Sequence, residues 1–314
     1  MNMKPEILMV GPMMPQLMVA LERDYIVHRL WEAPDRDALL EKIGSNVKAI
    51  ATNGALGASG SLINALPNLE IIALYGVGVD AIDLSIAKKR GIPITTTPDV
   101  LTEDVADMAL ALLLATARRI VVGDQYVRTG QWARGEMALT RRVNGKRVGI
   151  LGLGRVGKAL AKRLEALNMK ISYTNRKELD VPYASYRDLA KMAGDVDFLV
   201  VTAAGGDATR KIVNRPVLET LGPNGILINV SRGSIVDEEA LIDALKEAKL
   251  GGAGLDVFAS EPNVPEELKS MPNVVLQPHH ASGTIETRSA MGDLVARNLE
   301  AHFAGKPLLT PFNY

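Results

Sequence analysis

The strongest constraint on the fold is a glycine-rich segment near the middle of the chain, which reads Val-Gly-Ile-Leu-Gly-Leu-Gly-Arg-Val-Gly over residues 148–157. An apolar, β-branched run leads into it and an amphipathic helical pattern, Arg155–Leu167, follows, so it predicts a strand, a tight turn and a helix. Gly152 would permit the turn, Gly154 would let a pyrophosphate approach the backbone, and Gly157 would let the helix pack on the strand. The free N–H groups of a helix N-terminus attract phosphates, so the segment predicts a dinucleotide site. The alternative is a turn that binds nothing.

The next predicted strand, Lys170–Thr174, indicates which dinucleotide is bound. An NAD site normally has an acidic residue at this strand end, about 20 residues past the first glycines. Here the chain has Asn175, Arg176 and Lys177 instead. A carboxylate would repel a 2′-phosphate, whereas a guanidinium group matches its geometry. We therefore expect NADP(H) as the cofactor, with NAD(H) less preferred; the alternative is that these are solvated loop charges.

Length and charge exclude several classes of protein. A chain of 314 residues is long enough for two domains. Its 36 basic and 36 acidic side chains balance, which argues against a nucleic acid or an anionic membrane as partner. With no cysteine, disulfides, thiol nucleophiles and thiolate metal sites are excluded, and no metal is expected. The longest apolar stretch, Met108–Ala117, is too short to cross a bilayer, and the N-terminus shows no signal-peptide pattern, so a cytoplasmic location is expected.

Strand-like and helix-like segments alternate along the chain, which predicts an α/β fold with parallel sheets covered on both faces. The first series has strands at Ile7–Val10, Tyr25–His28, Ala49–Thr52, Ile71–Ala73 and Ile94–Thr96, separated by helical patterns such as Arg36–Ile43, Leu62–Leu66 and Ser85–Lys89. The second series has six strands, at Arg147–Leu151, Lys170–Thr174, Phe198–Thr202, Gly225–Asn229, Gly252–Asp256 and Val274–Gln277.

Two long helices frame the second series. A helix over Glu103–Arg119 should link the two series, with acidic residues early and arginines at its end, as the helix dipole favours. The stretch Thr129–Asn144 is polar and irregular and contains Trp132. A final helix, Ile285–Phe303, is expected to return the chain to the first domain.

The candidates for acid–base chemistry are four histidines. His28, in an apolar strand, and His302, in the last helix, are expected to be structural or on the surface. His279 and His280 follow Pro278 at the carboxyl end of a buried strand, where ligands gather in open α/β sheets. Histidine is a suitable general acid or base there because it titrates near neutral pH. The alternative is a turn histidine held by the backbone.

Charged residues follow two neighbouring strands. Arg232 comes after the strand ending near Asn229, and the carboxylates of Asp256 and Glu261 follow the next strand. Together with His279, these groups suit the reduction of a 2-oxo acid. A guanidinium group would bind the carboxylate and carbonyl oxygens, and an imidazolium would protonate the carbonyl oxygen as hydride reaches the carbon. A carboxylate would orient the imidazole and favour its charged form.

At these segments the chain resembles the D-isomer-specific 2-hydroxyacid dehydrogenase family. The matching blocks occur in the family's order and spacing and comprise residues 149–157, 229–238, 252–262 and 278–279. The resemblance covers nearly the whole chain and implies two Rossmann-like, doubly wound parallel-sheet domains with a cleft between them. It implies a discontinuous substrate domain of residues 1–99 plus 286–314, and a dinucleotide-binding domain of residues 100–285. Members are usually homodimers that bury the linking-helix region, so a homodimer is expected.

The resemblance also implies residue roles. The catalytic residues would be Arg232, Glu261 and His279, with His279 rather than His280 as general acid/base. The cofactor-binding residues would be Thr102, Gly152, Leu153, Gly154, Arg155, Val156, Gly157, Asn175, Arg176, Lys177, Thr202, Ala203, Ala204, Val230, Ser231, Arg232, Asp256 and His279. Asp256 matches the aspartate that holds the nicotinamide carboxamide. The substrate-binding residues would be Asn53, Gly54, Val77 and Gly78, with Arg232 and His279.

Within the family, residues 173–177 are similar to those of NADP-using glyoxylate/hydroxypyruvate reductases, and residues 98–107 also resemble those of hydroxyphenylpyruvate reductases. We therefore expect NADPH-dependent reduction of glyoxylate and hydroxypyruvate to 2-hydroxy acids. The alternatives are a bulkier 2-oxo acid, such as hydroxyphenylpyruvate or 2-ketogluconate, and a dinucleotide-sensing binding protein. Two departures bear on this: residues 201–206 replace the family's usual Pro-Leu-Thr wall, and Arg134 and Met137 stand where some members supply a tryptophan to the neighbouring subunit's site.

Overall fold

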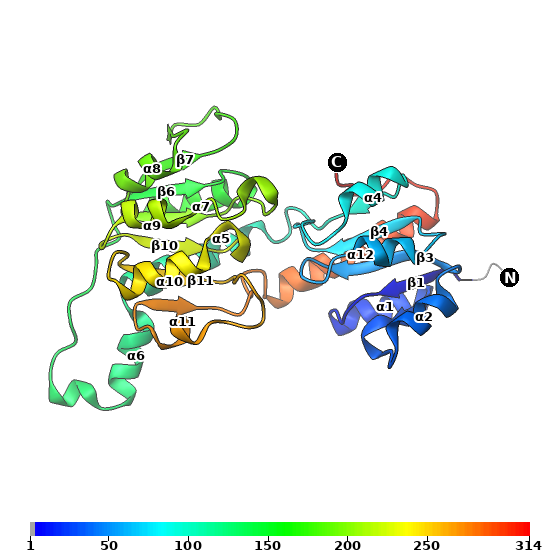
Figure 1. The fold of residues 1–314 in the computed structure, drawn as a ribbon, viewed down its shortest axis with the longest axis horizontal. Coiled ribbons are helices and arrows are strands. Elements are labelled where there is room, and N and C mark those ends of the chain that lie inside the picture. Colours follow the sequence, from blue (N-terminus) through cyan, green and yellow to red (C-terminus); the bar gives the residue numbers. More distant parts are fainter. Residues whose placement is uncertain (1–3) are drawn as a thin grey trace. The chain divides into compact units, whose positions relative to one another are not determined.

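The computed structural model describes residues 4–314 and divides the chain into two compact units (Figure 1). Unit 1 comprises the described residues up to Leu101 together with Ser282–Tyr314. Unit 2 is the intervening segment, Thr102–Ala281. Both have an α/β fold with a parallel sheet, as the sequence predicted.

Unit 1 has a five-stranded sheet in the order β2-β1-β3-β4-β5. Its strands are β1 (Glu6–Met9), β2 (Ile26–Arg29), β3 (Val47–Asn53), β4 (Ile71–Tyr75) and β5 (Ile94–Thr95), and all of them pair in parallel. The residues of β4 are all buried, as expected of a strand covered on both faces. The order reverses between β1 and β3, so the carboxyl ends of these strands form the edge where ligands usually bind.

Helices cover both faces of this sheet. On one face α1 (Pro15–Asp24) packs on α12 (Ile285–Phe303), which also contacts β4. On the other face, α2 (Arg36–Ile43), α3 (Gly60–Asn64) and α4 (Leu84–Lys89) contribute Ile43, Ile63 and Ala87 to a buried apolar cluster. The C-terminal helix therefore completes the core that the N-terminal segment begins. A short 3-10 helix, Leu30–Glu32, follows β2.

Unit 2 has a seven-stranded parallel sheet in the order β12-β11-β10-β9-β6-β7-β8. Its strands are β6 (Arg147–Leu151), β7 (Lys170–Thr174), β8 (Ala184–Ser185), β9 (Phe198–Val201), β10 (Ile226–Asn229), β11 (Gly252–Leu255) and β12 (Val274–Leu276). The order reverses between β6 and β9, which puts the glycine-rich turn after β6 at the point where α/β sheets bind nucleotides.

The helices of unit 2 form two sets. In one set α5 (Thr102–Ala117) packs on α7 (Arg155–Ala166) and on β10 and β11. In the other, α8 (Leu189–Asp195), α9 (Arg215–Leu221) and α10 (Glu238–Lys246) share a buried apolar cluster with the sheet and with α11 (Glu266–Ser270). Short 3-10 helices lie at Asp207–Thr209 and Gly233–Ile235.

Most predicted elements are present within a few residues. The sequence analysis gave no ranges for helices α1 and α8–α11, and three further details differ from the prediction. The sequence analysis predicted six strands in the second series and missed β8, a pair of exposed residues with no apolar pattern. The linking helix ends at Ala117 rather than Arg119, because Arg119 has a left-handed backbone with φ of 49°. A further helix, α6 (Ile120–Arg128), follows that turn where none was predicted.

The segment after α5 extends away from the sheet of unit 2 (Figure 1). It consists of α6, the 3-10 helix Gln131–Arg134 and the irregular chain up to β6. None of the residues of α6 is buried. Within residues 4–314, no helix has the length and the apolar character needed to cross a membrane.

Candidate active site

Three neighbouring strands of unit 2 end in the residues that the sequence analysis singled out. Strands β10, β11 and β12 are adjacent and parallel, so their carboxyl ends lie at one edge of the sheet. Arg232 follows β10, Glu261 follows β11, and His279 follows β12. Residues almost 50 positions apart in sequence are brought to this edge because the parallel strands all run in the same direction.

Glu261 and His279 form a direct pair. The Oε2 atom of Glu261 lies 2.7 Å from Nδ1 of His279, and its Oε1 accepts the backbone N–H of Phe258 at 3.0 Å. The His279 side chain is 40% exposed and that of Glu261 27%, so the carboxylate is the more enclosed partner. Both oxygens of Glu261 are thus fixed, and one of them sets the plane of the imidazole ring.

Glu261 remains ionised at neutral pH. Its burial opposes ionisation, but the hydrogen bond from His279, the N–H of Phe258 and the positive charges of His279 and Arg232 outweigh that effect, so the pKa of Glu261 lies below its usual value. An ionised carboxylate only accepts hydrogen bonds, so Nδ1 of His279 is the donor of the pair. Nε2 is therefore the ring nitrogen that is left to give or take a proton.

Arg232 lies beside this pair, next to a glycine whose lack of a side chain is required. A Cβ atom on Gly233 would lie 1.9 Å from the carbonyl carbon of Phe258 and 2.5 Å from the backbone nitrogen of Ala259. The Arg232–Gly233 backbone is therefore packed directly on the turn that leads to Glu261. The Nη1 atom of Arg232 donates to the carbonyl of Ser231 at 2.7 Å.

Asp256 shapes the loop that carries His279. It is completely buried, and its two carboxylate oxygens accept the backbone N–H groups of His280 at 2.7 Å and Ala281 at 3.0 Å. Its carbonyl accepts the N–H of His279 at 2.8 Å, and His279 has a left-handed φ of 52°. Burial raises the pKa of Asp256, although the two N–H groups oppose the shift. The structure therefore shows Asp256 holding the His279 loop.

The glycine turn fits a dinucleotide. A Cβ on Gly154 would meet nothing within 4 Å, so the backbone there is open to a ligand. Helix α7 begins at Arg155 without a side-chain cap, which leaves the first N–H groups of the helix available to phosphate oxygens. A Cβ on Gly157 would lie 2.5 Å from the carbonyl oxygen of Gly152, so close packing also requires this glycine.

The residues after β9 and β10 pack against that turn. Thr202 donates from Oγ1 to the carbonyl of Gly152 at 2.6 Å. A Cβ on Gly152 would lie 2.5 Å from the backbone nitrogen of Ala203, and the Ser231 hydroxyl donates to the Ala203 carbonyl. The ends of β6, β9 and β10 therefore form one continuous surface.

The segment after β7 contains the predicted selectivity residues. Asn175 accepts the N–H of Leu153 at 2.7 Å through its side-chain oxygen, so it stabilises the glycine turn. Arg176 and Lys177 are exposed. Across residues 4–314, no carboxylate forms an ion pair with either cation.

The remaining predicted residues lie in less distinctive positions. Thr102 is the first residue of α5, Val230 is buried directly after β10, and the carbonyl of Ala204 accepts the Thr209 hydroxyl at 2.8 Å. Arg155 and Val156 form the first turn of α7.

In unit 1, the predicted substrate residues follow two adjacent strands. Asn53 ends β3, and its side chain caps a turn by accepting the N–H groups of Ala55 and Leu56, while Gly54 lies within that turn. Val77 and Gly78 follow β4, and residue Val77 is 44% exposed.

Sequence reasoning missed two residues that support the site. Asn229, 1% exposed at the end of β10, donates to the carbonyl of Arg232 and accepts the N–H of Ser231. Glu238 accepts the N–H of Ala259 at 3.0 Å and so fixes the turn before Glu261. Both residues lie in the block 229–238 that resembles the family, but the sequence analysis gave neither of them a role.

The other two histidines have partners outside this edge. His28 pairs with Glu6 at 2.7 Å across β1 and β2, and His302 lies 3.3 Å from Glu70. Each contact joins two segments of unit 1 that are distant in sequence, consistent with the structural role expected for both histidines. The imidazole of His280 is exposed, and only its backbone is held by Asp256.

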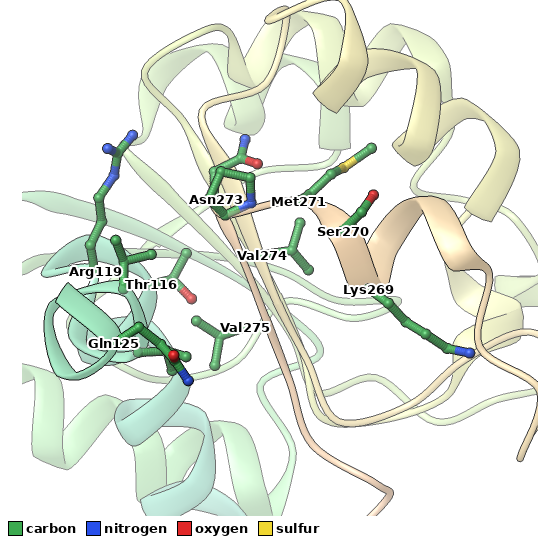
Figure 2. Close-up of a pocket in the computed structure, with 12 residues that line it drawn as sticks. Thr116, Arg119, Gln125, Lys269, Ser270, Met271, Asn273, Val274 and Val275 are labelled. Carbon is green, nitrogen blue, oxygen red and sulfur yellow. The ribbon is translucent and has the colours of Figure 1, made fainter. Parts of the chain in front are cut away.

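A cavity of about 350 Å³ lies at the opposite end of β12 (Figure 2). It is lined by α5 and α6 on one side and by residues 269–275, which lead into β12, on the other. Arg119 and Lys269 stand on opposite sides of it in the view (Figure 2). It contains none of the paired acid–base groups and is separate from the Glu261–His279 edge.

Comparison with known proteins identifies what this arrangement is similar to. Residues 110–281 match the family model for the NAD-binding domain of D-isomer-specific 2-hydroxyacid dehydrogenases. The chain is 51% identical over 306 residues to a glyoxylate/hydroxypyruvate reductase A of Arabidopsis thaliana, covering 97% of this chain and 98% of that protein. It is 48% identical over 306 residues to a hydroxyphenylpyruvate reductase of Plectranthus scutellarioides, with the same coverage. The crystal structure of an NADPH-dependent glyoxylate/hydroxypyruvate reductase from Sinorhizobium meliloti, in complex with NADP and malonate, matches with a TM-score of 0.93 and 45% identity, covering 98% of this chain and 97% of that one.

Proposed function

Because this chain belongs to the D-isomer-specific 2-hydroxyacid dehydrogenase family, we propose that it reduces glyoxylate and hydroxypyruvate to their 2-hydroxy acids with NADPH. The observation that carries the proposal is the Glu261–His279 pair, 2.7 Å apart, at the sheet edge that also carries Arg232. The similarity to the Arabidopsis thaliana and Sinorhizobium meliloti reductases supports the choice of substrates and coenzyme.

In the proposed reduction, His279, Glu261 and Arg232 each have a separate role. When bound, the nicotinamide supplies a hydride to the keto carbon. His279 donates its Nε2 proton to the carbonyl oxygen, which completes the alcohol. Ionised Glu261 stabilises the charged imidazole through Nδ1 and holds its orientation. Arg232 binds the substrate's oxygens through its guanidinium group and stabilises the charge that develops on the carbonyl.

Arg176 and Lys177 would bind the 2′-phosphate of NADPH. Both are exposed, and no carboxylate of the described chain neutralises them, so their charge is available to a phosphate. The N–H groups at the start of α7 would bind the pyrophosphate. The roles of Asn53, Gly54, Val77 and Gly78 in binding substrate stay predictions.

Replacing His279 tests the catalytic proposal. We expect His279→Ala to lower kcat by roughly 10²–10⁴-fold, the usual value of general acid–base catalysis, while NADPH affinity stays close to that of the wild type. His280→Ala is the matched control, because the structure holds only its backbone. Near-normal turnover of His279→Ala would contradict the assignment.

A bulkier 2-oxo acid is the second candidate substrate, favoured by the 48% identity to a hydroxyphenylpyruvate reductase. Steady-state oxidation of NADPH and NADH with glyoxylate, hydroxypyruvate, hydroxyphenylpyruvate and 2-ketogluconate separates the two. A higher kcat/KM for the aromatic or sugar acid would replace the proposed substrate. NADPH binding without turnover of any of these acids would instead indicate a dinucleotide-sensing protein.

We further propose that the chain forms a homodimer through the segment around α6. This segment exposes several large apolar residues, each of them at least 50% accessible to solvent: Ile120, Val121, Val127, Trp132 and Leu139. Water contact with such an apolar surface is unfavourable, and a second copy with the same segment would cover it. A Cβ on Gly123 would lie 3.6 Å from the Met137 sulfur, so the chain after the 3-10 helix folds back towards α6.

A charge on that face tests the dimer. We expect Val127→Glu to convert the protein from a dimer to a monomer in light scattering, because burying a carboxylate in an apolar interface is costly. Val19→Glu, at another exposed valine, is the control and should stay dimeric. A monomeric wild-type protein would contradict the proposal.

A cytoplasmic location is proposed because the reaction draws on the NADPH pool. Fractionation of cells expressing the tagged protein would test it, and recovery outside the cytoplasmic fraction would contradict it.

A further inference from the structure

Tyr173, the next-to-last residue of β7, forms two hydrogen bonds through its buried hydroxyl group. Tyr173 is 1% exposed, and its hydroxyl contacts the backbone of a single residue six positions later. The hydroxyl accepts the N–H of Leu179 at 2.9 Å and donates to the carbonyl of Leu179 at 3.2 Å. Buried phenol groups need such partners, and here both bonds fix one point of the chain.

The chain before Leu179 is fixed at its other end as well. The carbonyl of Thr174 accepts the N–H of Gly152 at 3.0 Å, and the side chain of Asn175 accepts the N–H of Leu153 at 2.7 Å. Between these anchors and Leu179 lie three exposed residues: Arg176, Lys177 and Glu178. The cations therefore project from a short span held at both ends.

Because both ends of the segment 175–179 are anchored by hydrogen bonds, its backbone is preorganised for ligand binding. Loop ordering on binding opposes affinity, and a backbone fixed in advance avoids that cost. A guanidinium group also requires a defined position to match a phosphate with two hydrogen bonds. The side chains of Arg176 and Lys177 are exposed to solvent, so the position of their backbone determines which points in space their charged ends can reach.

We propose that Tyr173 is a positioning residue for coenzyme selectivity: through Leu179 it holds the segment that presents Arg176 and Lys177 to the 2′-phosphate. This inference rests on the proposed use of NADPH. Tyr173 itself does not contact the coenzyme, because it is buried in the sheet.

Tyr173→Phe removes only the hydroxyl and keeps the buried ring. Binding of 2′,5′-ADP and of 5′-ADP to the full-length protein, measured by calorimetry, reports on the 2′-phosphate without any turnover. We expect the ratio of the two affinities to fall by about three- to tenfold, the effect of one or two lost hydrogen bonds, while 5′-ADP affinity is unchanged. The KM for NADPH should rise by the same factor and the KM for NADH should not.

Two further variants distinguish failure of the proposed role of Tyr173 from failure of the proposed use of NADPH. Tyr186→Phe is the matched control, because the Tyr186 hydroxyl bonds Asp195 and not the selectivity segment; its ratio should equal that of the wild type. Arg176→Ala tests the underlying proposal. If the wild type does not prefer 2′,5′-ADP, or if Arg176→Ala leaves the preference unchanged, the coenzyme proposal is wrong and this inference falls with it.

If Arg176→Ala loses the preference but Tyr173→Phe keeps it, only the role of Tyr173 is wrong. An equal loss of both nucleotides in Tyr173→Phe would show a general structural role and also overturn the inference. Hydrogen exchange of the wild-type protein without nucleotide gives a second measurement that needs no variant. The Leu179 amide should be protected, and exchange at the rate of an open loop would contradict the proposal.

Discussion

At the scale of single residues, the candidate site depends on close backbone packing. Gly233 lies so near the Phe258–Ala259 backbone that no side chain fits between them. The same turn is fixed by Glu238 and by Glu261 itself, which each accept one backbone N–H from it. The position of Glu261, and through it the orientation of His279, is therefore set by groups that take no part in the chemistry.

We expect Gly233→Ala to lower kcat strongly because the new Cβ would displace that turn. A shift of a reacting group by roughly 1 Å costs about 10²-fold in rate. NADPH affinity should change much less, because the glycine turn after β6 is not touched. Gly135→Ala is the control, since a Cβ there meets nothing within 4 Å. Turnover of Gly233→Ala equal to that of the control would show that this packing does not position Glu261.

At the scale of elements, the helix that begins at the glycine turn is tied to the helix before it. Arg163 of α7 donates to Asp107 at 2.6 Å and lies 2.8 Å from Glu103, both on α5, and it also donates to the carbonyl of Ala159. Its side chain is 21% exposed, whereas the two carboxylates are 66–70% exposed. The network therefore holds α7 in place with a modest contribution from each pair.

We expect Arg163→Ala to lower the free energy of unfolding by about 1 kcal/mol, since its partners are mostly in solvent. Arg163→Lys keeps the charge but loses the fork geometry, so it should recover only part of the loss. Chemical denaturation at low and high salt measures both. A wild-type-like Arg163→Ala would show that apolar packing alone holds α5 to α7.

At the scale of the whole molecule, the chain forms two units, each with a buried apolar cluster built from its own residues. The proposed nucleotide-binding residues all lie in unit 2, Thr102–Ala281. A ligand stabilises only the folded structure to which it binds, by about 2.7 kcal/mol at 100 times its Kd.

We therefore expect calorimetry to show two unfolding transitions, of which NADP⁺ raises the Tm of one. Arg176→Ala should reduce this shift with NADP⁺ and leave the shift with NAD⁺ unchanged. An equal shift of both transitions would indicate that the units unfold together.

The α/β class, most strands and helices, the family and the candidate residues could all be predicted from the sequence alone. Its periodic apolar runs and the glycine turn are local signals, and local signals need no knowledge of distant contacts. Strand β7 was predicted with its observed ends, and so was α12. Among the strands of the second series, only β8 was not predicted, because its two exposed residues show no apolar pattern.

How these residues act together became visible only in the folded chain. It showed that Glu261 holds His279, that Asp256 holds the loop behind it, and that Tyr173 reaches Leu179. The end of α5 was also decided there, by the left-handed backbone of Arg119. These are hydrogen bonds and close contacts between segments brought together by strand order, and residue spacing along a chain does not encode which atoms meet. The residue types were readable from the sequence, but their partners depend on packing.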